Sequence, residues 1–194
     1  MARSVGISRS QVIEVAGALA DAHGLAQLTL AQVAAQLGVR LPSLYNHVAG
    51  LPGLQRELSL AGVRQLGERI GRAAIGKSED AAVLAVALAY RAFVLEHPGL
   101  YAATVQAPAP DDAELRQASQ AIIDVVLAVL APYGLGDEAA IHAVRGLRSI
   151  VHGFATLELA GGFGMPLNRD ESFMQLLRAY VAGLRASDQR QATQ

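Results

Sequence analysis

Hydrophobic and polar positions recur with helical spacing along nearly the whole chain. Apolar side chains return every three or four residues, and no run alternates at the two-residue period of a β-strand. No Asn-Gly or Asp-Gly pair marks a hairpin turn. The pattern therefore predicts an all-α fold of about nine helices, separated by glycine, proline and capping residues.

The first fifty residues divide into three short helices. Ser8 with Gln11 and Thr29 with Gln32 stand at the spacing of capping boxes, so each pair predicts a helix start. Each of these two helices is followed by a glycine, which is typical of a helix end. A proline in the first turn suits a third helix over residues 42–48. The second and third helices have the proportions of a helix–turn–helix.

Longer helices are expected beyond residue 53. We therefore predict an N-terminal helix–turn–helix domain over residues 1–53 and a C-terminal helical bundle over residues 54–194. The helices of the bundle are expected at residues 54–76, 78–97, 98–106, 111–133, 137–160 and 170–186.

Composition excludes several classes of protein. Of the 194 residues, 52% are hydrophobic and 17% are charged, which is unlike a disordered chain. The absence of cysteine excludes a disulfide framework and thiolate metal ligation. Polar side chains interrupt the longest uncharged window, residues 22–39, so no membrane span is expected there. With no apolar run near the N-terminus, we expect no signal peptide and a cytoplasmic protein.

The net charge of −1 hides an asymmetry. Residues 1–77 hold eight Lys and Arg against four Asp and Glu, a balance of +4. Residues 78–194 hold eight basic against thirteen acidic residues, a balance of −5. The split indicates that the N-terminal part binds a polyanion, although +4 is small for a DNA-binding surface.

Polar side chains gather on the predicted third helix. Arg40, Ser43, Tyr45, Asn46 and His47 point outward if the apolar residues between them face the first helix. They offer hydrogen-bond donors and acceptors to phosphates and base edges. The alternative is an ordinary three-helix corner with a solvated polar face, and spacing alone leaves both interpretations open.

Residues 29–48, TLAQVAAQLGVRLPSLYNHV, closely resemble the DNA-binding motif of tetracycline-repressor-like (TetR) transcriptional regulators. The segment LYNHV at residues 44–48 is the most specific part of the match. The resemblance implies a helix–turn–helix domain followed by a bundle that binds a ligand and forms a dimer. The expected partners are a double-stranded DNA operator, a small-molecule effector and a second copy of the chain.

The resemblance also implies roles for single residues. Thr29, Tyr45 and His47 would hold phosphates, while Ser43 and Asn46 would face bases. The set of expected DNA contacts comprises Arg3, Thr29, Arg40, Leu41, Pro42, Ser43, Tyr45, Asn46 and His47.

Within that set, Arg40 would reach a guanine edge or a phosphate. Leu41 and Pro42 would supply apolar contacts such as a thymine methyl group, and Arg3 would reach a neighbouring groove. Leu51 departs from the family pattern, because many relatives carry a phosphate-binding lysine at this place. Fixed charges can therefore neutralise few phosphates.

Two further runs resemble a subgroup of the family. His-Pro-Gly-Leu-Tyr at residues 97–101 and Val-His-Gly at residues 151–153 are similar to a C-terminal domain with a Trp-His-Gly signature. Val151 stands where that signature has tryptophan.

Small residues dominate residues 81–106, which leaves space for a largely apolar ligand. Each candidate lining residue could instead be ordinary core packing. The candidate ligand-binding residues are Tyr90, Phe93, Tyr101, Val105, Leu127, His142, Arg145 and His152.

The last two predicted helices carry apolar stripes that suit a four-helix dimer interface across a two-fold axis. The same stripes could also close the core of a monomer. The candidate interface residues are Val144, Leu147, Val151, Phe154, Phe173, Leu177, Tyr180 and Leu184.

An enzyme is the competing class, and the sequence argues against it. The five histidines are dispersed, and no His-Glu-x-x-His, Gly-x-Ser-x-Gly or phosphate-loop pattern occurs. Glu138 and His142 stand four residues apart, but a surface hydrogen bond is a simpler interpretation than a metal site. We expect no cofactor and no metal. A helical scaffold that binds proteins and has lost DNA binding remains the alternative function.

Overall fold

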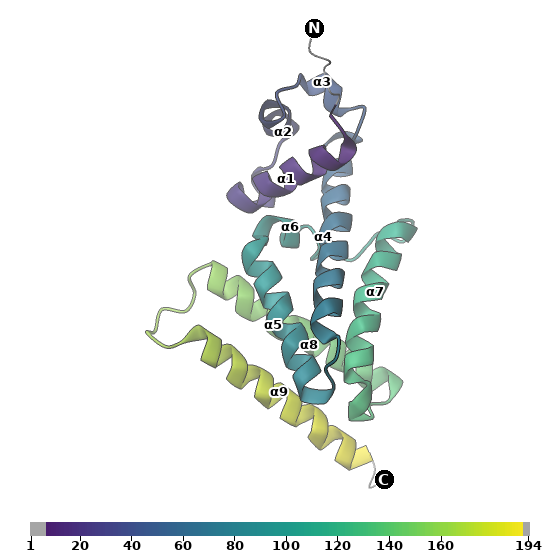
Figure 1. Cartoon of the computed structure of the whole chain (residues 1–194), viewed down its shortest axis with the longest axis vertical. Helices are drawn as coiled ribbons and strands as arrows, with labels where there is room; N and C mark the ends of the chain where they lie inside the picture. The colour runs from purple at the N-terminus through teal and green to yellow at the C-terminus, as the bar shows by residue number, and fades with distance from the viewer. Residues whose placement is uncertain (1–6, 192–194) are drawn as a thin grey trace. The chain divides into compact units, whose positions relative to one another are not determined.

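The computed structural model describes residues 7–191, and every regular element among them is a helix (Figure 1). Short 3₁₀ turns occur at Leu25–Gln27 and Ala131–Tyr133. The nine α-helices of this part of the chain confirm the predicted all-α fold. They are α1 (Arg9–His23), α2 (Leu30–Gln36), α3 (Leu41–Leu44), α4 (Gly50–Ala74), α5 (Glu79–Glu96), α6 (Pro98–Ala102), α7 (Ala113–Leu130), α8 (Asp137–Leu159) and α9 (Arg169–Gln191).

The chain forms two compact units that do not follow the sequence order. The first unit takes the chain up to Arg64 together with Glu96–Arg116, and the second takes Gln65–Leu95 and the chain from Gln117 onward. Helices α4 and α7 thus each begin in the first unit and continue into the second. The functional division at residue 53 stays a prediction.

Both predicted capping boxes are present. The Gln11 amide donates to Ser8 Oγ at 3.2 Å, and the Ser8 amide donates to Gln11 Oε1 at 2.8 Å. Thr29 and Gln32 make the same reciprocal pair, at 3.3 and 2.8 Å. Two amides at each helix start, which have no partner within the helix, are thereby satisfied.

Helix α3 is shorter than predicted. It ends at Leu44, whereas the sequence predicts a helix over residues 42–48. Beyond Leu44 the chain continues in tight turns, with the amides of His47 and Val48 both donating to the Leu44 carbonyl at 2.9 and 3.0 Å. One carbonyl accepts from two amides, so the regular helical hydrogen bonding stops and the last four residues of the LYNHV segment follow the helix.

Other helix ends also differ from the prediction, and α9 continues to Gln191, five residues beyond its predicted end. Helix α4 begins at Gly50 and not at residue 54, because Pro52 falls in the first turn, where its missing N–H costs no hydrogen bond. Helix α6 ends at Ala102, four residues before the predicted end. Helix α7 begins at Ala113, two residues after the predicted start, and is capped by Asp112, whose Oδ1 accepts the Leu115 amide at 3.0 Å.

Helix α6 packs on α1 inside the first unit. Gly99 lies so close to α1 that a Cβ atom there would overlap the carbonyl carbon and oxygen of Ala20. Asp21 accepts the Leu100 amide at 2.8 Å and also lies 3.0 Å from His97 Nδ1. A backbone contact and a shared carboxylate therefore hold residues 96–102 against the helix–turn–helix.

A buried arginine organises the second unit. Arg91 on α5, only 7% exposed, makes two bonds to Glu158 of α8, at 2.8 and 2.9 Å. It also bonds Asp170 of α9 at 2.7 Å, and its guanidinium lies 5.4 and 5.0 Å from the ring centroids of Phe154 and Phe173. Three helices thus meet at one cation that is both paired and stacked.

One helix has the length and hydropathy of a membrane span. It covers Ala113–Tyr133, with a mean hydropathy of 1.3, and only 22% of the tested window is buried. Unlike the uncharged residues 22–39, this segment contains Glu114, Arg116 and Asp124. Core helices of soluble proteins pass the same test, so a single such helix is weak evidence for a membrane.

We expect Gly99→Ala to destabilise the protein by about 2 kcal/mol or more, because the new methyl group would overlap the α1 backbone and force the two helices apart. Guanidinium unfolding measures this change. Gly17→Ala is the matched control within α1: the nearest atom to its Cβ is Leu58 Cδ2 at 3.8 Å, an ordinary contact. The control should be neutral or stabilising by roughly 0.5–1 kcal/mol. Equal stability of the two variants would contradict the close approach.

Candidate nucleic-acid interface

The turn between α2 and α3 sets the direction of the predicted DNA-reading part of the chain, residues 40–48, called the recognition segment below. Gly38 has φ +66°, the left-handed conformation that glycine adopts without strain. The Val39 amide donates to the Ala34 carbonyl at 3.0 Å and the Gly38 amide to the Ala35 carbonyl at 3.1 Å. This pair of bonds is a Schellman motif, which ends α2 and turns the chain sharply into α3.

Two apolar side chains anchor the recognition segment in the first unit. Leu44 is fully buried and Val48 is 5% exposed, so residues 44 and 48 face inward. The polar residues between and before them face outward, which matches the expectation from the sequence.

The structure leaves the predicted DNA contacts accessible. Tyr45 is 59% exposed and Leu41 39% exposed, and Thr29, Arg40, Pro42 and Asn46 are also exposed, while Ser43 and His47 are half-buried. Arg3 lies outside the described residues. No described side chain pairs with Arg40, so its charge is available at the start of α3.

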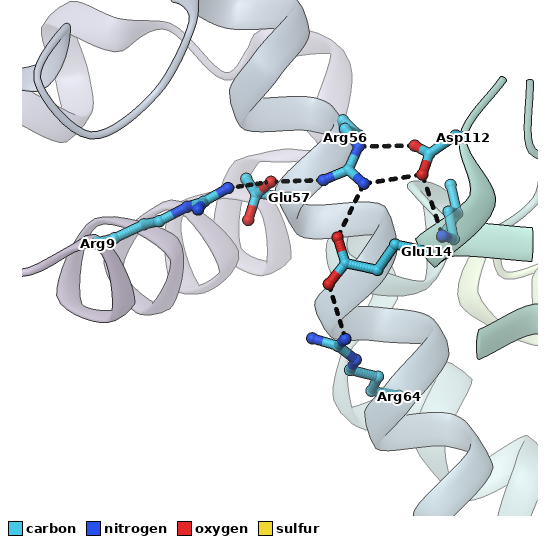
Figure 2. Close-up of polar contacts among 7 residues, drawn as sticks. Arg9, Arg56, Glu57, Arg64, Asp112 and Glu114 are labelled. Carbon is cyan, nitrogen blue, oxygen red and sulfur yellow. Dashed lines mark hydrogen bonds and ion pairs between the residues drawn. The ribbon is translucent and has the colours of Figure 1, made fainter. Parts of the chain in front are cut away.

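Most other cations of the first unit are already engaged by carboxylates (Figure 2). Arg56 Nε and Nη2 donate to the two oxygens of Asp112 at 2.6 and 2.8 Å. Arg56 also bonds Glu57 at 2.9 Å and Glu114 at 3.0 Å, and Arg64 bonds the other oxygen of Glu114 at 2.9 Å. Arg9 of α1 pairs with Glu57 at 2.6 Å.

The pairs of Arg56 with Asp112 and with Glu114 stay charged at neutral pH. Hydrogen bonds from Arg56 lower the pKa of Asp112 and of Glu114, and hydrogen bonds to Asp112 raise the pKa of Arg56. The network therefore neutralises three arginines of the first unit and leaves Arg40 as the unpaired arginine of the recognition segment.

Sequence reasoning missed Arg56, Glu57 and Asp112. Arg56 and Asp112 are 56 residues apart, and no local spacing signals that they meet. Only the packing of residues 96–116 into the first unit brings them together.

The predicted ligand-binding residues lie in both units. Tyr101 and Val105 belong to the first unit and the other six to the second. Tyr90, Phe93 and Tyr101 are buried, Leu127 and His152 are half-buried, and Val105, His142 and Arg145 are exposed. His142 lines a shallow cavity with residues 136–139 and lies 3.8 Å from Glu138.

A larger cavity of the second unit was not predicted. It has a volume of about 480 Å³ and lies where α4 and α7 end and α5 begins. Small side chains leave this space open. Its apolar lining includes Gly71, Ala74, Ile75, Val125, Val129 and Pro132.

The predicted dimer residues lie mostly inside a single chain. Val144 and Tyr180 are half-buried, and the Tyr180 hydroxyl donates to the Ala143 carbonyl at 2.7 Å. The other six are each at most 9% exposed and pack within their own chain: Leu147, Val151, Phe154, Phe173, Leu177 and Leu184. A helical period marks an apolar stripe but does not say whether the same chain or a second one covers it.

Comparison with known proteins agrees with the helix–turn–helix and the bundle. The profile of the tetracyclin repressor-like C-terminal domain matches residues 83–180. The HTH-type transcriptional regulator Rv0681 of Mycobacterium tuberculosis is 35% identical over 95% of this chain and 84% of its own length. The HTH-type regulator YobS of Bacillus subtilis is 32% identical over 95% of this chain and 96% of its own length.

Solved structures share the fold. A TetR variant from Acinetobacter baumannii AYE, in complex with minocycline, superimposes with a TM-score of 0.72 at 21% identity, covering 94% of this chain and 98% of that one. The named relatives are transcriptional regulators and not enzymes. The chain therefore belongs to the TetR family of helix–turn–helix transcriptional regulators.

Proposed function

We propose that this regulator represses transcription by binding a palindromic operator as a homodimer, and that a small, largely apolar effector releases it. The observation that carries the proposal is the exposed recognition segment, in which polar side chains surround an arginine with no described partner. Two copies related by a two-fold axis would read two half-sites about one helical turn apart or a multiple of that distance.

Hydroxyl groups, ring nitrogens and one arginine would make the DNA contacts. Tyr45 and His47 suit phosphates, Ser43 and Asn46 suit base edges, and Arg40 suits either. Thr29 would offer the start of α2 to a phosphate, where amides and the helix dipole favour an anion. Arg3, Leu41 and Pro42 complete the proposed set.

The proposed dimer uses α8 and α9 with the loop that joins them. Because the predicted stripe is largely buried, the contacts to a second copy would come from the exposed apolar residues of the same region. These are Leu157, Leu159, Met165, Leu167 and Leu176, which are 39–77% exposed. Such a surface is costly to leave in water, and a cytoplasmic homodimer would cover it.

The effector would bind in the second unit. The A. baumannii neighbour was solved with minocycline, which supports a small-molecule site in this fold. The predicted lining on α5 and α8 and the cavity at the end of α4 are two candidate places within this unit. Either would let ligand binding favour one conformation over another, as linkage requires. The Trp-His-Gly subgroup stays a prediction.

The alternative function is a protein-interaction scaffold that has lost DNA binding. Leu51 and the extensive pairing of arginines favour it, because both reduce the positive charge available to phosphates. The exposed Tyr45 and unpaired Arg40 favour DNA binding.

We expect Tyr45→Ala and His47→Ala each to weaken binding by about tenfold or more, since each removes a hydrogen bond to a charged phosphate. The DNA is selected from a random pool by the wild-type protein, and affinity is measured by fluorescence anisotropy. His23→Ala, an exposed histidine at the end of α1, is the control and should bind normally. A scaffold would select no DNA, and dimer mass by sedimentation should be unchanged in all variants.

Binding should depend only weakly on salt. If each protomer neutralises one or two phosphates, the slope of log K against log salt for the dimer lies between about −2 and −4. Leu51→Lys restores a basic residue just after the recognition segment and should steepen the slope by about 0.9 per protomer. A wild-type slope near −8 would contradict this prediction, because it would mean that the dimer neutralises about nine phosphates.

An apolar effector should raise the melting temperature and release the DNA. If the effector occupies the predicted lining, Tyr90→Phe should lower its affinity up to about tenfold through loss of one hydroxyl group. Ile75→Arg, at the cavity near the end of α4, should then leave the thermal shift unchanged. Loss of the thermal shift only in Ile75→Arg would assign the effector to that cavity. The absence of a thermal shift with every compound of a broad panel would contradict the proposed ligand response.

A further inference from the structure

One carboxylate oxygen is shared by two arginines from different helices. Glu57 Oε1 on α4 lies 2.6 Å from Arg9 Nη2 of α1 and 2.9 Å from Arg56 Nη1 of α4. Glu57 is only 8% exposed, so water competes poorly for it. The charge of Arg9 is therefore held by a carboxylate that also serves Arg56.

The other edge of the Arg56 guanidinium binds the residues at the start of α7. Its Nε and Nη2 form a fork with both oxygens of Asp112, and Nη2 also reaches Glu114 at 3.0 Å. Asp112 is the residue that caps α7 through the Leu115 amide. A bidentate arginine–carboxylate pair tolerates little displacement, because both of its bonds depend on alignment in one plane.

From these contacts we infer that Arg56 is a positioning residue for DNA binding. Through Arg56, the position of the first turn of α7 determines the affinity for operator DNA. The inference rests on the proposed function. Asp112 binds one edge of the Arg56 guanidinium, and Nη1 on the other edge binds Glu57. Because Glu57 also binds Arg9, α1 is linked to α4. Helix α4 begins at Gly50, directly after the recognition segment, and α1 packs on α2, which in turn packs on α3.

Displacement of the start of α7 would break the fork. Arg56 would then no longer hold the Glu57 carboxylate in the place where Arg9 meets it, which loosens α1 on α4. Helix α7 continues into the second unit, so an event in that unit has a covalent route to this network. The expected result is weaker DNA binding without any change in the residues that contact DNA.

The test compares Arg56→Gln and Asp112→Asn in the full-length protein on DNA selected by the wild type. Asparagine still caps a helix, so Asp112→Asn removes the charge and keeps the α7 cap. Each variant should weaken binding by about fivefold or more. Arg64→Gln, which loses only a partly exposed pair with Glu114, is the matched control and should stay within about twofold of wild type.

Two readouts separate positioning from other roles. A lost phosphate contact would reduce the salt slope by about 0.9 per protomer, whereas a positioning residue leaves the slope unchanged. The double variant should bind no more weakly than Arg56→Gln alone, since both changes break the same link. Circular dichroism and sedimentation should match the wild type, and if Arg56→Gln does not fold, Asp112→Asn decides the test.

Wild-type affinity in both single variants, a reduced salt slope, or additive losses would each overturn the inference. If the wild type binds its selected DNA and Arg56→Gln binds equally well, this inference fails and the proposed function stands. A wild type that selects no DNA overturns both.

Discussion

The close approach of α6 to α1 is the contact on which the first unit depends. A glycine at residue 99 allows backbone to meet backbone, and Asp21 then satisfies an amide at the start of α6 while it also pairs with His97. Through this contact, residues 96–116 pack with residues 1–64 in the first unit, although they lie far from them in the sequence. Only in that arrangement can the start of α7 reach Arg56.

Local features of the sequence predicted the fold well. Capping boxes, a left-handed glycine and an apolar period depend on residues within about four positions of each other, so one sequence is enough to identify them. Asp112 was harder to assign as the cap of α7, because Asp111 beside it has the same chemistry. Pro42 and Pro98 were correctly predicted at helix starts, whereas Pro52 was placed before α4, since a proline can precede a helix or stand in its first turn.

Contacts between residues far apart in the chain could not be predicted from the sequence. The pairing of Arg56 with Asp112 depends on tertiary packing, and so does the burial of the stripe on α8 and α9. An amphipathic helix shows that one face is covered, and the partner that covers it depends on helices distant in the chain. The exposed set in the recognition segment was easier to identify, because resemblance to a known motif fixed which side of a short helix faces outward.

The buried guanidinium of Arg91 constrains how this protein can change in evolution. It satisfies Glu158 and Asp170 and fills the space beside two phenylalanine rings. Lysine at this position would carry the charge but could not form the planar fork, and an apolar residue would leave Glu158 with only the longer contact to Arg169, at 3.7 Å. Substitution at position 91 should therefore be tolerated best together with loss of the acid at position 158, since the two side chains together determine how α5 meets α8.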